Sequence, residues 1–177
     1  MDGVRICNPY AGISYVCFAA INTFEVQEKN VDFYFAKDIP HGTVSICKYV
    51  SKVSSHLKEC YVYTPYGYEE GDERYPVLYL QHGVGESETG WIWQGKANLI
   101  MDCLIAEGKC VKMIVVMSSG YAFKDGEKPV FYPGNFESEL IHNIIPYIEN
   151  NFRVRKGRDY RAMAGLSLGS AQPTDIV

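Results

Sequence analysis

The sequence predicts an α/β fold, in which a mostly parallel sheet is covered by helices on both faces. Residues 76–81 form a continuous, largely apolar run, and residues 112–117 are apolar after Lys112; both have the composition of buried strands. Helical patterns at residues 94–107 and 136–152 alternate with these strands, and a further short strand is predicted at residues 160–164. Strands and helices that alternate in this order are typical of a parallel sheet.

The first 42 residues have a different pattern. Two short runs of strand composition, residues 13–20 and 31–35, are separated by polar turns and show no helical period. Residues 38–43 contain Pro and Gly, which marks a linker or a domain boundary. We therefore expect residues 1–42 to be a β-rich remnant with its linker, and residues 43–177 to form the domain that contains the parallel sheet.

The next segment predicts a hairpin. Residues 43–50 and 57–65 are rich in β-branched and aromatic residues and are joined by a short polar segment. This arrangement places a hairpin at the edge of the larger sheet. The acidic loop at residues 66–74 is interpreted as a solvated surface with no part in the chemistry.

The strand at residues 76–81 leads into the turn His82-Gly83-Val84-Gly85. Ligands bind at the carboxyl ends of strands in open α/β sheets, so the backbone N–H of Val84, or of a glycine beside it, is a candidate oxyanion donor. The alternative is a simple strand-ending turn. We interpret His82 as a residue that bonds to the backbone and shapes this turn, not as a catalytic base.

Trp91 and Trp93 follow in a loop. Large aromatic side chains either line a pocket for a flat or sugar-like group or cover a core, and the sequence leaves both readings open. The helix at residues 94–107 is expected to stop at Gly108. The helix at residues 136–152 is expected to kink at Pro146, with His142 at the edge of the core or in solvent.

The predicted strand at residues 160–164 leads into Gly165-Leu166-Ser167-Leu168-Gly169. A Gly-x-Ser-x-Gly pattern between a strand and a helix is typical of a nucleophile elbow, because only small residues fit where the strand and the helix approach each other. Ser167 is then a candidate nucleophile, and the N–H of Leu168 is the oxyanion donor next to it. The alternative is an ordinary Gly-Ser turn.

Composition excludes several classes of function. The net charge of −4 and the lack of a basic cluster argue against a nucleic-acid partner. No apolar run has the length of a membrane span, and the first ten residues lack the layout of a signal peptide. The six cysteines show no metal-binding spacing; free thiols are favoured over scattered disulfides. No metal or cofactor is expected.

Several ordered motifs together resemble a known family. PVLYLQHGVGESETGW, GKCVKMIVVM, FESELIHNIIPYIENNFRV and YRAMAGLSLGS resemble the esterase D-like branch of the α/β hydrolases, and within it the feruloyl and acetylxylan esterases of carbohydrate esterase family one. The likeness covers residues 43–172. Residues 1–42 also resemble the tail of a β-sandwich that is similar to carbohydrate-binding modules.

The resemblance implies an α/β-hydrolase fold and roles for particular residues. Ser167 is the implied nucleophile, and the backbone N–H groups of Val84 and Leu168 form the implied oxyanion hole. The implied substrate-binding residues are Gly83, Trp91, Ser118 and Tyr121. Family members of this kind are secreted or attached to the cell surface.

One departure from the family pattern is evident. In this fold the triad runs in the order serine, acid, histidine, whereas only ten residues follow Ser167 and all four histidines precede it. Asp175 is the one later acid, and Pro173 lies where the helix after the serine should continue. We expect a partial fold that is truncated at both ends, without the triad acid and base and with doubtful activity. An open sheet edge beside the serine would permit self-association.

The function expected from these observations is that of a serine carboxylesterase. It would hydrolyse hydroxycinnamoyl (feruloyl) or acetyl esters on xylan-type polysaccharides, with a feruloylated or acetylated xylan oligosaccharide as its partner. One alternative is a non-catalytic carbohydrate-binding or interaction fragment. Another is an enzyme similar to siderophore esterases or S-formylglutathione hydrolases.

Overall fold

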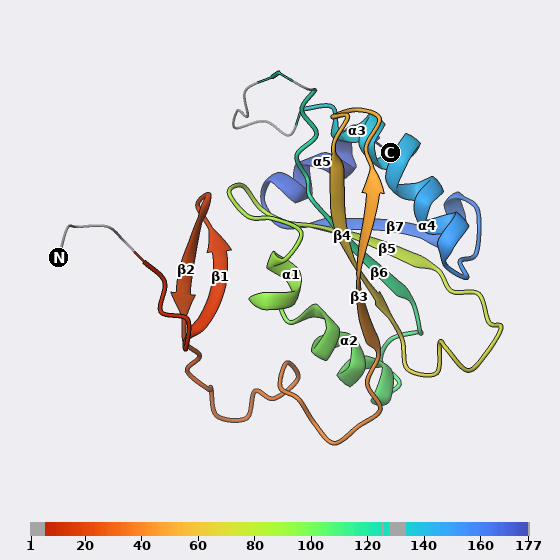
Figure 1. Ribbon diagram of the computed structural model, residues 1–177. Helices are drawn as coiled ribbons and strands as arrows, with labels where there is room; N and C mark the ends of the chain where they lie inside the picture. The colour runs from red at the N-terminus through yellow and green to blue at the C-terminus, as the bar shows by residue number, and fades with distance from the viewer. Residues whose placement is uncertain (1–5, 125, 128–133, 177) are drawn as a thin grey trace.

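The computed structural model describes residues 6–124, 126–127 and 134–176, and it gives no side-chain detail for residues 173–176. A five-stranded sheet runs through the centre of the molecule (Figure 1). Its strands lie in the order β3-β4-β6-β5-β7, with bounds β3 Thr43–Val50, β4 Leu57–Thr64, β6 Ile114–Ser118, β5 Val77–Gln81 and β7 Arg161–Gly165. Strand β5 is parallel to β6 and β7, whereas β4 is antiparallel to β3 and β6. The predicted α/β fold is confirmed, although its sheet is more evenly mixed than predicted.

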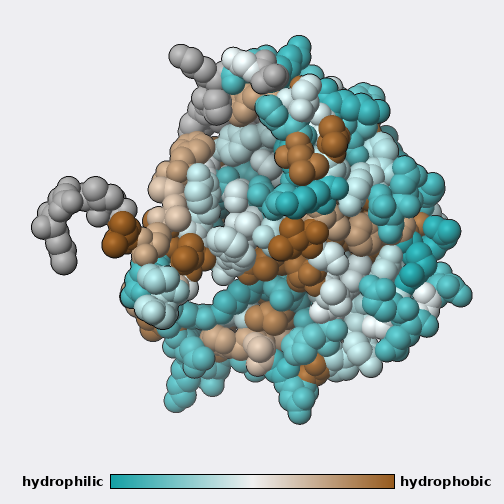
Figure 2. Space-filling view, in the orientation of Figure 1, coloured by the Kyte–Doolittle hydropathy of each residue, from teal (hydrophilic) through white to brown (hydrophobic). Residues whose placement is uncertain are grey.

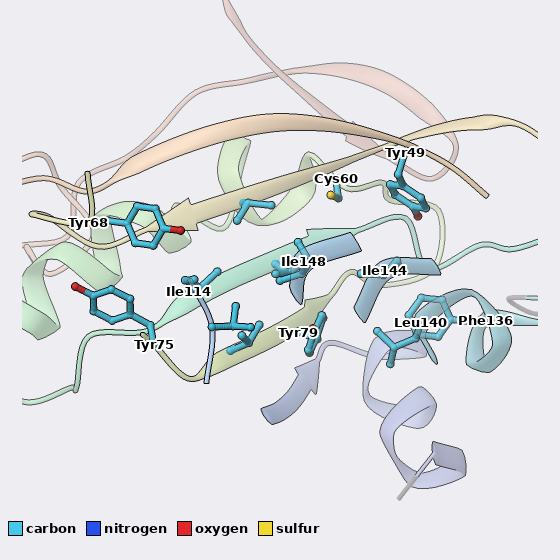
Figure 3. Packing of buried hydrophobic residues seen from close by; sticks show 14 residues of the cluster. Tyr49, Cys60, Tyr68, Tyr75, Tyr79, Ile114, Phe136, Leu140, Ile144 and Ile148 are labelled. Carbon is cyan, nitrogen blue, oxygen red and sulfur yellow. The ribbon is translucent and has the colours of Figure 1, made fainter. Parts of the chain in front are cut away.

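Helices cover both faces of the sheet because side chains of its central strands alternate between them. Val115 and Met117 of β6 face a cluster that includes Met101 of helix α2 (Ala97–Ala106). Ile114 and Val116 face the opposite cluster, which includes residues of the helices between Phe136 and Asn151. Figure 3 shows this second cluster, with Ile144 and Ile148 packed over the strands. Every residue of β6 is buried, as the uninterrupted apolar run predicted.

The predicted edge hairpin is confirmed in position and register. Strands β3 and β4 pair along their full lengths, and Cys47 lies directly opposite Cys60. Cys60 is fully buried and Cys47 is half-buried. All six cysteines are free thiols. A hydrogen bond between the two sulfur atoms lowers the pKa of Cys47 and raises the pKa of Cys60.

The single helix expected at residues 136–152 is divided into three parts. Helices α3 (Phe136–Glu139) and α4 (Ile145–Asn151) flank a π-helical segment at Leu140–Ile144. The N–H of Ile145 donates to the oxygen of Leu140, five residues back, and Pro146 has no N–H to donate. The irregularity predicted at Pro146 therefore takes the form of a wide turn directly before the proline.

Glu139, directly before the wide turn, lies in a buried polar cluster. This carboxylate has no exposed surface and accepts hydrogen bonds from the hydroxyls of Tyr49 (2.9 Å) and Ser51 (2.5 Å). The ammonium group of Lys58 lies 3.4 Å from it, and burial lowers the pKa of Lys58. Lys58 also donates to the backbone oxygen of Tyr121 at 2.7 Å, so the cluster ties the edge hairpin to the loop after β6.

The N-terminal residues differ from their prediction. The run at residues 13–20 is divided by a turn into strands β1 (Gly12–Val16) and β2 (Ala19–Thr23), which pair only with each other. Residues 31–35 form turns and not the predicted strand, and no described strand pairs with them. Instead, two of their aromatic rings lie at the start of helix α2: the ammonium group of Lys96, directly before this helix, lies 5.1 Å from the ring centres of Tyr34 and Phe35. The division into a module at 1–42 and a domain at 43–177 stays a prediction.

A buried carboxylate fixes the segment between the hairpin β1–β2 and the central sheet. Asp102 of helix α2 is 4% exposed and accepts hydrogen bonds from the N–H of Gly42 and the hydroxyl of Tyr63, each at 2.8 Å. His41 Nδ1 lies 2.8 Å from its other oxygen, and His41 Nε2 lies 2.9 Å from the carbonyl of Lys37. Both acceptors favour the protonated ring and raise the pKa of His41.

Candidate active site

The Gly-x-Ser-x-Gly segment forms a tight turn from β7 into helix α5 (Leu168–Ile176). Ser167 has a φ of 55°, a left-handed conformation that is unfavourable for a residue with a side chain. A Cβ on Gly165 would lie 2.3 Å from the oxygen of Gly169, and a Cβ on Gly169 would lie 2.6 Å from the oxygen of Gln81. Both glycines are therefore required by the close approach of strand and helix. The predicted strand-turn-helix geometry is confirmed.

The loop after β5 lies directly beside the serine. A Cβ built on Gly83 would be 3.7 Å from Cβ of Ser167 and 3.6 Å from the oxygen of Leu166. Ser167 itself is exposed, and its hydroxyl forms no hydrogen bond with any described residue. The hydroxyl is thus open to an incoming molecule at the point where the two loops meet.

The backbone N–H groups of Val84 and Leu168 at this point have no acceptor among the described residues, and the same is true of the N–H of Ser167 itself. Around Val84, the adjacent groups are all bonded. The N–H of Gly83 donates to the carboxylate of Glu86 (3.0 Å), and the N–H of Gly85 donates to the hydroxyl oxygen of Tyr121 (2.9 Å). Leu168 begins helix α5, whose dipole adds partial positive charge there. Two unpaired donors beside an exposed serine can hold a developing negative oxygen.

His82 shapes these loops, as the sequence predicted. It is 1% exposed, its Nε2 accepts a hydrogen bond from the N–H of Gly120 (2.9 Å), and its Nδ1 lies 2.8 Å from the oxygen of Gly83. An acceptor at one nitrogen and a donor at the other fix the neutral ring, and burial lowers the pKa of His82. Both nitrogens are engaged, so His82 cannot take a proton from Ser167 in this arrangement.

The other described histidines and acids form no hydrogen bond with the serine. His41 is bonded to Asp102, and His142 is exposed on the π-helical segment. The side chain of Asp175 lies outside the described part of the chain, as does that of Pro173, although helix α5 continues to Ile176. None of the described residues donates to or accepts from the Ser167 hydroxyl.

The predicted substrate-binding residues divide into two groups. Gly83 and Tyr121 lie at the serine and at the loop beside it. Ser118, however, is 1% exposed, and its hydroxyl accepts a hydrogen bond from Gln81 Nε2 of the neighbouring strand at 3.2 Å. The Ser118 hydroxyl is therefore buried and not open to a substrate. Trp91 lies on helix α1 (Gly90–Trp93), half-buried against the core, and its indole N–H donates to the oxygen of Gln81 at 2.9 Å. The tryptophan therefore covers the core and also supports the loop.

Trp91 also borders a shallow hollow next to the serine. The hollow has a volume of about 110 Å³ and is lined by Glu86, Gly90, Trp91, Gln94, Gly95 and Leu166. The carboxylate of Glu86 accepts from Gln94 Nε2 (2.9 Å), so polar and aromatic groups meet in it. The hollow therefore offers both hydrogen-bonding and apolar surface.

Comparison with known proteins agrees with the geometry. Residues 55–172 match the sequence profile of the Esterase family. The chain belongs to the Esterase family. An endo-1,4-beta-xylanase/feruloyl esterase of Xylanibacter ruminicola is 46% identical over 155 residues, which are 84% of this chain and 21% of that protein.

Solved structures give the same assignment for this Esterase-family chain. The CE1 ferulic acid esterase of the anaerobic fungus Anaeromyces mucronatus is 32% identical, with a TM-score of 0.70 over 82% of this chain and 58% of the fungal one. Its complex with ferulic acid is similar at 30% identity, also with a TM-score of 0.70, over 82% of this chain and 57% of the fungal one. The chain is thus similar to carbohydrate esterase family one, as its motifs indicated, and it spans little more than half of these solved relatives. In the described part of the chain, no helix has the length and apolarity of a membrane span.

Sequence reasoning missed two features of this candidate site. Glu86 fixes the N–H of Gly83, and its place three residues after that glycine was an available signal. Phe18 reaches the same loop from the N-terminal hairpin, and its N–H donates to the oxygen of Gly85 at 2.9 Å. No local pattern marks that contact, because the two residues are far apart in the sequence.

Proposed function

We propose that Ser167 is the nucleophile of a serine carboxylesterase that hydrolyses hydroxycinnamoyl esters on xylan-type polysaccharides, with acetyl esters as smaller substrates. One observation carries the proposal: an exposed serine in a left-handed turn lies next to the N–H groups of Val84 and Leu168, for which the described part of the chain offers no acceptor. The xylanase/feruloyl esterase relative and the fungal ferulic acid esterase support the acyl group. The polysaccharide supplies the alcohol.

The reaction follows from these positions. The hydroxyl oxygen of Ser167 attacks the ester carbonyl, and the carbonyl oxygen takes the negative charge between the two amides. Collapse of the intermediate breaks the bond to the sugar oxygen, which leaves as a hydroxyl with the proton that Ser167 gave up, and the acyl group stays on Ser167. Water then attacks the acyl-enzyme and releases the hydroxycinnamic acid.

Among the described residues, none is placed to accept the proton of Ser167, so proton transfer limits the reaction. The serine proton needs an acceptor, and the rings of His82 and His41 are both engaged elsewhere. Oxyanion donors and binding without the triad leave an acceleration of about 10³ to 10⁴ over water. We therefore expect acylation of this chain by an activated ester to be easier to observe than repeated turnover.

Acylation tests the proposal directly. The chain is mixed with 4-nitrophenyl ferulate, and mass spectrometry measures the addition of one feruloyl group and the peptide that carries it. We expect the adduct on Ser167 and none in Ser167→Ala. Ser55→Ala is the matched control, because Ser55 is also exposed and left-handed (φ 59°). An adduct that persists in Ser167→Ala would remove the assignment.

A non-catalytic role in binding carbohydrate is the second candidate. The engagement of His82 and His41 away from the serine favours it, together with the hollow beside Trp91. Binding of xylan oligosaccharides, measured by calorimetry, without any adduct on Ser167 would support this role in place of the first.

A further inference from the structure

The tip of the N-terminal hairpin lies on the loop that carries Val84. The N–H of Phe18 donates to the oxygen of Gly85, and a Cβ on Gly85 would be 2.9 Å from Cα of Cys17. Gly85 is two residues from Gly83, so the two Cα atoms are at most about 7.6 Å apart. In Figure 1 the hairpin β1–β2 stands beside helix α1 and this loop. The tip therefore borders the candidate active site although it precedes the central sheet by many residues.

The turn at the tip is unfavourable for the residues that form it. Cys17 and Phe18 have φ values of 52° and 62°, and two consecutive left-handed residues between paired strands are typical of a type I′ turn. Such turns favour Asn-Gly, because left-handed backbone costs other residues about 1–2 kcal/mol each. Strained residues of this kind persist where the surrounding structure holds them, often at functional sites.

The Phe18 ring lies next to Tyr121 at the rim of the site. Its centre is 6.2 Å from that of Tyr121, whose ring is stacked on Phe123 at 6.1 Å and lies 5.6 Å from His82. Phe18 remains 57% exposed, whereas Tyr121 is half-buried and held at its hydroxyl by the N–H of Gly85. The rings of Phe18, Tyr121 and Phe123 thus form a row beside the loop that carries Val84. Phe18 is at the outer end of this row, where its ring is exposed.

The hairpin has little else that would require an aromatic ring at this place. Strands β1 and β2 pair only with each other, and all five residues of β2 are exposed. The space-filling view shows the hairpin and the residues next to it, here called the N-terminal arm, along one side of the molecule, with hydrophobic residues open to solvent (Figure 2). Phe24, on the same arm, is 91% exposed. Packing of the hairpin itself therefore does not account for a bulky residue in a strained turn.

We propose that Phe18 is a specificity-determining residue, whose ring forms with Tyr121 an aromatic wall for the hydroxycinnamoyl group of the ester held at Ser167. The proposal rests on the proposed function. If the ester carbonyl is held by the N–H groups of Val84 and Leu168, a hydroxycinnamoyl chain that extends along the Val84 loop places its aromatic ring next to Phe18 and Tyr121. Stacked and edge contacts between aromatic rings are favourable there. An acetyl group is too short to reach these two rings. The N-terminal hairpin thereby selects the acyl group.

The variant Cys17→Asn/Phe18→Gly removes the Phe18 ring but keeps the turn, so it tests the ring alone. Asn-Gly suits the type I′ turn and keeps the N–H that donates to Gly85, so thermal unfolding should show an equal or higher Tm. Acylation of Ser167 is then measured with the 4-nitrophenyl esters of ferulate and acetate. We expect the ratio of the feruloyl to the acetyl rate to fall about three- to tenfold. Phe24→Gly, on the same arm, is the control and should keep the wild-type ratio.

A second measurement does not depend on acylation. Ferulic acid is titrated into the wild type and the double variant, and binding is followed by calorimetry; the expected dissociation constant rises by the same about three- to tenfold in the variant. An unchanged ratio, equal ferulate binding by the two chains, or no ferulate binding by the wild type would each overturn the role of Phe18. Failure of both esters to acylate the wild type would instead reject the proposed function, and the binding comparison would still decide on Phe18.

Discussion

Replacing Ser167 with glycine should stabilise the protein while it removes the nucleophile. The left-handed backbone at φ 55° costs a non-glycine residue about 1–2 kcal/mol. Glycine loses more backbone entropy on folding, which takes back about 0.5–1 kcal/mol. Among the residues that the structure describes, none forms a hydrogen bond with the Ser167 hydroxyl that the change to glycine would remove. Subtracting the lower values from each other, and likewise the upper values, gives a net gain of about 0.5–1 kcal/mol.

Thermal unfolding followed by circular dichroism measures this gain. At this chain length, 1 kcal/mol shifts the Tm by about 2–4 °C, so Ser167→Gly should melt about 1–4 °C higher than the wild type. Ser167→Ala keeps the strain and should show no such rise. Ser55→Gly relieves a similar φ of 59° away from the site, and should gain stability without loss of acylation. A Ser167→Gly chain that melts no higher than Ser167→Ala would refute the claim that the turn is strained.

Three further predictions concern groups outside the site. Glu139→Leu should destabilise the fold by about 3–5 kcal/mol in urea unfolding, because it leaves Lys58 buried without its carboxylate; the double change with Lys58→Met should cost less. The raised pKa of His41 gives stability that is fully present below its unfolded value of about 6.5 and is lost as pH rises through the folded pKa, so the Tm advantage of the wild type over His41→Gln should shrink with rising pH. Iodoacetamide should label Cys47 well before Cys60, as peptide mass spectrometry would show; equal labelling of the folded protein would contradict the shared proton between them.

The turn at Ser167 was predictable because its constraints are local. Gly165 and Gly169 lie two residues on either side of the serine, and both are required by contacts within the strand-turn-helix unit and with the end of β5. The same holds for His82, whose adjacent glycine turn indicated a bond to the backbone. Strands β5 and β6 were predicted for a similar reason, since an unbroken apolar run reports burial on both faces.

Other features depend on contacts that no local pattern records. The burial of Ser118 follows from Gln81 on the neighbouring strand. The inward position of Glu139 is matched by the hydroxyls of Tyr49 and Ser51, which come from a segment about 90 residues earlier in the sequence. Residues 31–35 have strand composition but no neighbouring strand to pair with, so propensity alone was misleading.

By itself, the sequence determined the α/β fold, the edge hairpin and the serine at the apex of its turn, because apolar periodicity and closely spaced glycines act over a few residues. Only the tertiary structure decided which amides remain unpaired at that serine, and that Phe18 of the N-terminal hairpin reaches the loop at Gly85. Those two facts depend on which distant segments meet. The meeting of segments is settled by packing and hydrogen bonding of the whole chain and not by the composition of any one part.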